Sequence, residues 1–598
     1  MVLPFKRSAA AVAVVCALVG GACFAQEAGP QSIVVTGQRG TSAWVRAESA
    51  HVVVLSDAPR EDVARLVEHL ERLDSLLRVY TDDYRPTSAG PESKLNLVYL
   101  NDVRDLDLVA ADRPANGIAL FRDCTDGTQG FLVRTAPLAA IDDDKLVKTP
   151  LDEGLSYASE AYARHFLYRH TDVRGPSAWI EGFANYFAGV RFGATQMVIG
   201  RTPPGVGRYF YFLDQGHRYN LDYADILGPR PFANLSDTRR RAAGVEFEAR
   251  SWLLAHYILG AGERRRKLGP FLNAVHQGAE PAAALRDAFG LDAGDASTAL
   301  WRYRLQRAEV MRVEQPPGPR PQIAITTMSA TSGGFMLADA ALKACPAPAQ
   351  GEALLRTLTA DAGAVPNVEA GQLALNRARV DWGDPAAALP WLEKTAHRAD
   401  AGADVLLLLA RAHLKLAAHL DAGARAPHLD AARAGLARAR ERDPGAGAVA
   451  LAALDLSLLA DGKPSPEALD GVLTAWRTGR DSRTLARAAV LASCYKVDVP
   501  RAEHILRTLE NDVRDPATAA WAAAFQRRLD VGLSLADIAA EMRLVPGAGG
   551  FSEWTIDQVS VMRDVEYNAG LEDARGFFEQ QMQNPDPSKA LLNPPTSR

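Results

Sequence analysis

The spacing of apolar residues divides the chain into regions with different predicted structures. Between residues 42 and 135, short apolar runs such as KLNLVYLND (residues 94–102) and GIALFRD (117–123) predict strands. Between them, residues 59–81 carry apolar side chains at a helical period: Val63, Leu66, Val67, Leu70, Leu73, Leu76 and Leu77. The first region therefore predicts a small sheet combined with at least one long helix.

From about residue 149 the pattern becomes helical. Thr149 as N-cap and Pro150 as first helical residue predict the start of a helix that ends near Tyr168. Two further helices are predicted over residues 175–193 and 245–262. Helices are expected to continue to about Val313, so a mixed α/β region before residue 135 is followed by a helical region.

The second half of the chain has a different organisation. EQPPGPRPQ is rich in proline, so residues 314–335 are expected to be a linker. Residues 336–582 contain one Ala- and Leu-rich helical segment after another, with an internal offset of about 45 residues. This pattern predicts an all-α, tetratricopeptide-like solenoid, with a non-repeating helical bundle as the alternative. Residues 583–598 are expected to be a disordered tail.

The N-terminus has the pattern of a secretory signal peptide. Lys6 and Arg7 precede an apolar run that is short for a membrane span, and small residues follow up to Ala25. Residues 1–25 are therefore expected to be cleaved, which predicts export to the periplasm or beyond. Residues 26–41 are expected to be a flexible leader, in which QSIVVTGQRG resembles the N-terminal segment of TonB-dependent receptors of Gram-negative bacteria.

The charge and the cysteine content limit which partners and which disulfide or zinc sites the chain is expected to have. The formal net charge is −5 with both signs mixed, which argues against a nucleic-acid partner, and no segment beyond the N-terminus predicts a transmembrane span. Cys124, Cys345 and Cys494 are too scattered for a disulfide framework or a zinc knuckle. All three are expected to be buried, unpaired thiols.

Four blocks in order resemble a family of secreted bacterial proteins with a gluzincin-type zinc-peptidase-like domain, often followed by helical repeats. The blocks are WVRAESAHVVVLSD, ARHFLYRH, SAWIEGFANYFA and ARSWLLAHYILG, and they span about residues 44 to 312. The resemblance implies that residues 42–313 are such a domain, with an α+β fold in which a small sheet is combined with a helical subdomain. In that family, two histidines of a His-Glu-x-x-His helix and an acidic residue of the next helix hold zinc, and the Glu acts on the bound water.

This chain departs from the family at the metal site. In the alignment Glu160 stands at the first histidine, Ala161 at the catalytic glutamate and Arg164 at the second histidine. His165 matches an additional family histidine, and Glu181 matches the third ligand. Only that third ligand is retained, so the resemblance implies a degenerate site with no metal, no cofactor and no intact catalytic residue.

The replacements suggest a different use of the same positions. Glu160 and Arg164 have the favourable i, i+4 order on one helix, and Glu181 is expected nearby, so Arg164 is predicted to bridge the two carboxylates. The alternative is that all three are solvated. His256 and Tyr257 are possible neighbours of the site, with a satisfied core histidine the favoured interpretation of His256.

The function that these observations favour is an exported, pseudopeptidase-like binding or scaffold module of the cell envelope. Its partner would be a protein or peptide held by the helical repeats. One alternative is an active peptidase with an atypical zinc site, and zinc is expected only in that case. Another is an accessory protein of TonB-linked transport, which depends on the leader segment.

Overall fold

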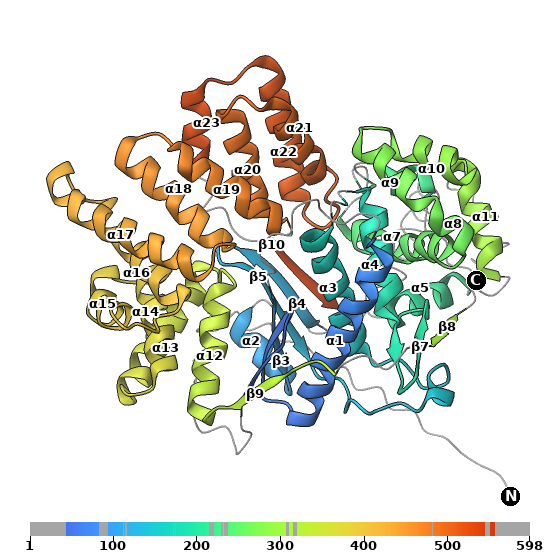
Figure 1. Ribbon diagram of the computed structural model, residues 1–598, viewed down its shortest axis with the longest axis horizontal. Coiled ribbons are helices and arrows are strands. Elements are labelled where there is room, and N and C mark those ends of the chain that lie inside the picture. Colours follow the sequence, from blue (N-terminus) through green and yellow to red (C-terminus); the bar gives the residue numbers. More distant parts are fainter. Residues whose placement is uncertain are drawn as a thin grey trace, which may run out of the picture.

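The protein is seen in a computed structural model that describes a large part of the chain. The described residues are 44–82, 94–111, 113, 117–171, 173, 175–214, 221–228, 231–232, 237–305, 310–314, 320–480, 482–543 and 551–556. The expected signal peptide, the leader with its TonB-like segment and the expected tail lie outside these residues. Figure 1 shows a central sheet beside α3, with an arc of yellow to orange helices along one side.

The N-terminal part contains both strands and helices. Its strands are β1 (Val45–Glu48), β2 (Val52–Ser56), β3 (Leu95–Leu100), β4 (Gly117–Cys124), β5 (Gly127–Val133), β6 (Arg191–Phe192), β7 (Gln196–Ile199) and β8 (Met311–Glu314). Its helices are α1 (Arg60–Tyr80), α2 (Leu106–Val109), α3 (Glu153–His170), α4 (Ser177–Ala188), α5 (Pro204–Asp214), α6 (Tyr223–Leu227), α7 (Asp237–Leu259), α8 (Gly262–Arg266), α9 (Leu268–His276), α10 (Pro281–Phe289) and α11 (Ala293–Leu305). The helix and strands predicted before residue 135, and the three helices predicted after it, are all present.

Helix α3 begins later than the sequence predicted. Thr149 and Pro150 remain outside it, and Asp152 is its N-cap, with a side chain that accepts a hydrogen bond from the Leu155 backbone N–H at 2.7 Å. The Thr135 hydroxyl donates to the same carboxylate at 3.0 Å. The Asp152 side chain satisfies a backbone N–H of the first turn that has no partner within the helix, and this stabilises a helix start directly after Asp152.

The C-terminal part is built mainly of helices. These are α12 (Ala330–Lys343), α13 (Pro348–Ala364), α14 (Glu369–Trp382), α15 (Leu389–Ala396), α16 (Ala403–Ala417), α17 (Ala422–Arg442), α18 (Gly447–Asp461), α19 (Pro466–Thr478), α20 (Arg483–Tyr495), α21 (Val499–Glu510), α22 (Pro516–Val531) and α23 (Leu535–Met542). Most contact the next helix along the chain, and α12, α14, α16, α18 and α20 also contact one another in sequence. Stacked rows of this kind are typical of helical-repeat proteins, so the predicted run of paired helices is confirmed.

A seven-stranded mixed sheet lies at the centre of the molecule. Its strand order is β10-β4-β5-β3-β2-β1-β9, where β9 is Ala324–Thr327 and β10 is Phe551–Ile556. The pairs β2–β3 and β3–β5 are parallel, and the other four pairs are antiparallel. Helix α1 is the crossover that a parallel β2–β3 pair requires, and it packs on the sheet and on α3.

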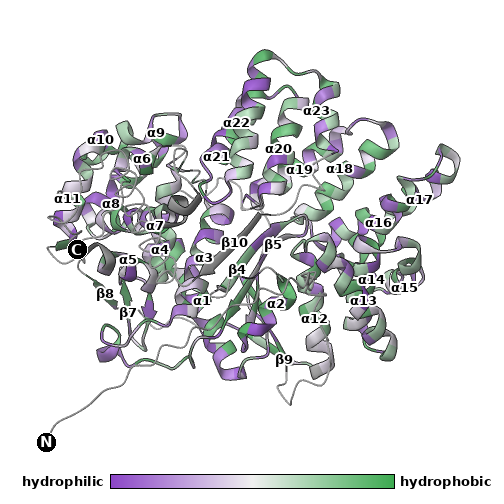
Figure 2. Cartoon of the chain, turned by 180° about the vertical axis from the view of Figure 1, so that it is seen from behind, coloured by the Kyte–Doolittle hydropathy of each residue, from purple (hydrophilic) through white to green (hydrophobic). Residues whose placement is uncertain are grey.

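The sheet is buried on both faces. In β3, Leu97 and Tyr99 belong to the core formed with α1, α3 and α4, whereas Val98 and Leu100 belong to a second core that contains Phe335 of α12. Successive side chains of a strand point to opposite faces, so the two cores sandwich the sheet. Figure 2 shows hydrophobic residues concentrated on these central strands. The helical part is therefore packed directly on the sheet.

Two predictions about the second half of the chain are wrong. The expected linker, residues 314–335, contains β9, which pairs with β1 from Val45↔Thr327 to Glu48↔Ala324, and also the start of α12. The region expected to be all-α, residues 336–582, contributes β10 to the opposite edge of the sheet. A proline-rich segment is incompatible with the interior of a helix, but an edge strand can form close to it. The prolines therefore did not exclude β9.

The prediction of unpaired cysteines is wrong for two of the three. Cys124, at the end of β4, and Cys345, just after α12, form a disulfide across a sequence separation of 221 residues. The Arg122 guanidinium donates to the Ala344 carbonyl at 3.3 Å beside it. Cys494 is buried and free, as predicted. The two half-cystines meet only because α12 packs on the sheet.

Candidate functional site

Helices α3 and α4 bring the sequence-predicted site residues together. The two helices pack against each other, and α4 also packs closely on α7. Gly182, directly after Glu181, makes this approach possible, because a Cβ at that position would clash with the Ser251 carbonyl of α7. The Glu-Gly pair of the sequence therefore places a carboxylate where three helices meet.

Arg164 bridges Glu160 and Glu181, as the sequence predicted. Its Nη2 atom lies 2.5 Å from Glu160 Oε1 and 3.1 Å from Glu181 Oε2. The side chains of Glu160, Arg164 and Glu181 are 14, 13 and 5 % exposed, so the ion pairs are largely shielded from water. The alternative of three solvated helix residues is thereby excluded.

A second arginine, which sequence reasoning missed, completes the group. Arg514 lies in the loop between α21 and α22, and its Nη2 atom contacts Glu181 Oε2, Glu160 Oε1 at 3.3 Å and Glu248 Oε1 of α7 at 3.6 Å. We call these five residues, Glu160, Arg164, Glu181, Glu248 and Arg514, the arginine–carboxylate cluster. Arg514 follows Glu181 by 333 residues, so no local spacing could have indicated it.

The loop that carries Arg514 is held on both sides. Asp512 accepts hydrogen bonds from the Arg483 guanidinium at 2.6 Å and from the backbone N–H of Arg514 at 3.0 Å. The Ser177 hydroxyl at the start of α4 donates to the backbone carbonyl of Asn511. The helical part thus presents Arg514 from a positioned loop, and the cluster joins the two parts of the molecule.

The surroundings of the cluster shift the pKa values of two of its carboxylates, Glu181 and Glu248, in opposite directions. Burial by itself would raise the pKa of Glu181, but Arg164 and Arg514 outweigh it and lower that pKa to about 2. Burial raises the pKa of Glu248 to about 7, with repulsion from Glu160 and Glu181 adding to the effect and Arg514 opposing it. Glu181 is therefore ionised, whereas the raised pKa of Glu248 means that this carboxyl keeps its proton to a higher pH than a solvated glutamate does.

These residues do not fit a zinc ion. A zinc site needs imidazole, thiolate or carboxylate ligands with lone pairs directed at the metal. Here Glu181 Oε2 already accepts from two guanidiniums, and Arg164 brings a permanent cation to a position the resemblance assigns to a ligand. Ala161 supplies no group that could take a proton. Within the described residues, no group of three or more His, Cys, Asp or Glu side chains is arranged to hold a metal.

The remaining sequence candidates have other surroundings. His165 is buried, with its ring tilted against that of Tyr162. The His256 side chain is fully buried, with Nδ1 2.9 Å from the Tyr303 hydroxyl and Nε2 3.1 Å from the Gly200 carbonyl. Burial lowers the pKa of His256 to about 4, so it is a neutral core histidine. The ring of Tyr257 packs under the Arg264 guanidinium, 4.0 Å from its centroid.

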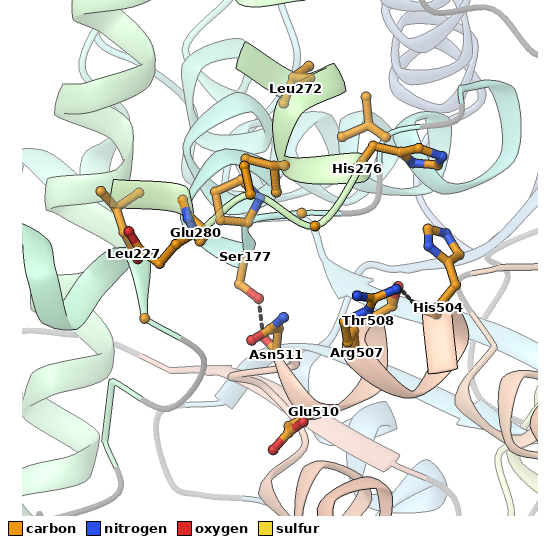
Figure 3. A pocket seen from close by; sticks show the side chains of 18 of the residues that line it. Ser177, Leu227, Leu272, His276, Glu280, His504, Arg507, Thr508, Glu510 and Asn511 are labelled. Carbon is orange, nitrogen blue, oxygen red and sulfur yellow. Dashed lines mark hydrogen bonds between the residues drawn. The ribbon is translucent and has the colours of Figure 1, made fainter. Parts of the chain in front are cut away.

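A cavity of about 700 Å³ lies between the two parts, next to the same loop (Figure 3). It is lined from one side by Ser177 and His276, and from the other by His504, Arg507 and Asn511. The His276 and His504 rings meet edge to face with centroids 4.8 Å apart. At this place the contact between the two parts is therefore incompletely filled, and polar and apolar side chains line it together.

Comparisons with known proteins find a partial similarity to one solved structure. No protein-family model matches this chain, and no curated protein matches it. A solved structure of a thermophilic TPR protein from Thermus thermophilus is similar to part of it, with a TM-score of 0.26 and 17 % sequence identity. That similarity covers 30 % of this chain and 92 % of the other.

With regard to membranes, no helix among the described residues combines the length and apolarity that a bilayer span requires.

Proposed function

We propose that this chain is an exported, catalytically inactive relative of gluzincin-type peptidases that acts as a binding or scaffold module in a Gram-negative envelope. The observation that carries the proposal is the arginine–carboxylate cluster. Two guanidiniums neutralise the carboxylate that the family resemblance assigns to the metal. The cluster supports a structural use of the former site.

The chemistry of peptide hydrolysis supports the same conclusion. Zinc peptidases need a metal-bound water of lowered pKa and a neighbouring base that takes its proton. Ala161 stands at the position of that base, and Arg164 at that of a ligand. A permanently charged guanidinium cannot accept a proton, so these residues offer no replacement for either role.

The stacked helices support a binding role. Helical-repeat proteins, including those of the tetratricopeptide type, present a continuous surface built from successive helix pairs. The row α12, α14, α16, α18 and α20 has this form. We assign the partner to the class of proteins or peptides, because such a surface offers extended contact area rather than one enclosed pocket.

Two features support export. Residues 1–25 have the charge and apolar pattern of a signal peptide. The Cys124–Cys345 disulfide suits an oxidising compartment, since structural disulfides are rare in the reducing cytosol. Detection of the mature chain, beginning near residue 26, in a periplasmic fraction tests this part of the proposal.

Metal content and hydrolysis test the catalytic part. We expect the purified mature protein to contain substoichiometric zinc and to show no hydrolysis of a peptide library above background, with or without a chelator. Stoichiometric zinc together with chelator-sensitive hydrolysis would support the active peptidase instead.

A restored site provides the positive control. Glu160→His, Ala161→Glu and Arg164→His together recreate two imidazoles at i and i+4 opposite Glu181. We expect this triple variant to bind zinc only when Arg514→Met is added, because Arg514 otherwise still occupies the Glu181 carboxylate. Zinc binding by the triple variant alone would show that Arg514 does not block the site.

A further inference from the structure

The outermost strand of the central sheet comes from the far C-terminal part of the chain. β10 pairs antiparallel with β4, from Phe551↔Asp123 to Ile556↔Gly117, with a shift of register between Thr555 and Ile556. Among the described strands, β4 is its one neighbour, so β10 closes this edge of the sheet (Figure 1). The strand is therefore an addition to a sheet whose other connections are made by residues before 328.

Without β10, the edge of β4 would be open. β4 pairs on its other side with β5 over the register Ala119↔Leu132 to Cys124↔Gly127. An edge strand presents a row of backbone N–H and C=O groups that another extended segment can satisfy. Strand addition of this kind is a common way in which proteins recognise extended polypeptides.

The end of β4 is tied to the helical part by hydrogen bonds and a disulfide. Asp123 accepts hydrogen bonds from the backbone N–H groups of Arg483 at 2.7 Å and Thr484 at 3.4 Å, at the start of α20. The next residue, Cys124, is joined to Cys345 by the disulfide. A pre-organised strand loses little conformational entropy when a second strand adds to it, which favours binding.

The sequence of β10 indicates which kind of peptide would bind to the edge of β4. FSEWTI contains two aromatic and two β-branched residues, Phe551, Trp554, Thr555 and Ile556, types that favour extended strands. The pairing is antiparallel and covers most of β4. A ligand for this edge would be an extended, aromatic- and β-branched-rich segment of about six residues.

We infer that the edge of β4 is a binding site for an extended polypeptide strand, and that β10 occupies this site from within the chain. A partner strand then has to compete with β10. A tethered segment competes at an effective concentration in the mM range, so β10 lowers the apparent affinity of the site for a free strand. This inference is independent of the zinc position, since it depends only on the backbone pairing.

Two adjacent proline variants of the full-length protein test the inference. In an antiparallel ladder, successive N–H groups point to opposite sides, so only one of Glu553 and Trp554 directs its N–H toward β4. Glu553→Pro and Trp554→Pro should therefore differ, because proline on the paired side removes a ladder hydrogen bond and proline on the outer side does not. Each variant serves as the matched control of the other.

The probe is a fluorescent peptide with the sequence of residues 549–558, followed by anisotropy. We expect one proline variant to bind it roughly tenfold or more tightly than the wild type does, and the other to behave like the wild type. A scrambled peptide should bind none of the three. Hydrogen exchange of the β4 amides should increase in the releasing variant and return to the wild-type rate when the peptide is added.

Three results would overturn the inference. The first is equal behaviour of the two proline variants, and the second is the absence of peptide binding by both of them. The third is wild-type binding as tight as that of the tighter-binding variant. Exchange measured on the wild type keeps the test valid if a variant fails to fold. In the wild type, β4 amides on the β10 side should be protected, and fast exchange there would contradict the pairing.

Discussion

Replacing Arg514 by methionine is the most informative perturbation of the arginine–carboxylate cluster. The change removes a charge and keeps most of the side-chain length. Glu181, whose side chain is 5 % exposed, then keeps Arg164 as its partner, while Glu248 loses the stronger of the two cations, Arg514 and Arg164, that oppose its acidic neighbours. The variant thus leaves excess negative charge in a shielded place.

The expected cost follows from the burial of the pair. Removing one partner of a buried ion pair costs about 3–5 kcal/mol. Arg164 still contacts Glu181, and Glu248 is 30 % exposed, so part of that cost is relieved. We expect Arg514→Met to lower the free energy of unfolding by about 2–4 kcal/mol.

Denaturant unfolding combined with a double-mutant cycle measures the effect. Arg514→Met and Glu181→Gln, singly and together, should give a coupling energy of about 1–3 kcal/mol. The matched control is Arg528→Met on α22, where a 46 % exposed arginine pairs with Glu541 at 2.9 Å. That surface pair should contribute under about 1 kcal/mol.

The reasoning would be refuted by a specific pattern of results. If Arg514→Met costs no more than Arg528→Met, or if the coupling energy with Glu181 is close to zero, the cluster does not hold the helical part onto α3 and α4. If Arg514→Met lowers the free energy of unfolding as expected but shows no coupling to Glu181, then Arg514 stabilises the protein through other contacts of its loop.

Three further predictions concern the rest of the molecule. The pKa of Glu248 in the folded chain, about 7, exceeds its ordinary value of 4.5, so the folded chain binds more protons than the unfolded chain between these two pH values. The free energy of unfolding should therefore fall as pH rises from 4.5 to 7. Urea unfolding of the wild type at several pH values should show this fall, and Glu248→Gln should lack the part that Glu248 contributes. Cys124→Ser with Cys345→Ser should lower the unfolding free energy by about 2–4 kcal/mol, and reductant should destabilise only the wild type. Arg377→Met should cost about 3–5 kcal/mol in the same assay, because this 1 % exposed arginine pairs with Asp339 at 2.7 Å, and a result under about 1 kcal/mol would contradict it.

Local pattern was sufficient wherever neighbouring residues decide the outcome. The helical period of residues 60–80 predicted α1, and the apolar run of residues 95–100 predicted β3. The bridge made by Arg164 was also predictable. Glu160 is four residues earlier on the same helix, and the apolar pattern of residues 175–193 placed Glu181 on the next helix.

Long-range contacts could not be predicted in this way. Arg514, the Cys124–Cys345 disulfide and the pairing of β10 with β4 each join segments hundreds of residues apart. The chain has many arginines and several strand-forming segments, and which of them meet depends on how whole surfaces pack. The periodicity of the sequence does not contain this information. The sequence by itself determined most of the helices and strands, their order along the chain and the pairing of Glu160 with Arg164. Only the tertiary structure decided that the helical part covers the sheet, supplies the second arginine and closes the sheet edge, because burial and backbone pairing act between surfaces rather than between neighbours in the chain.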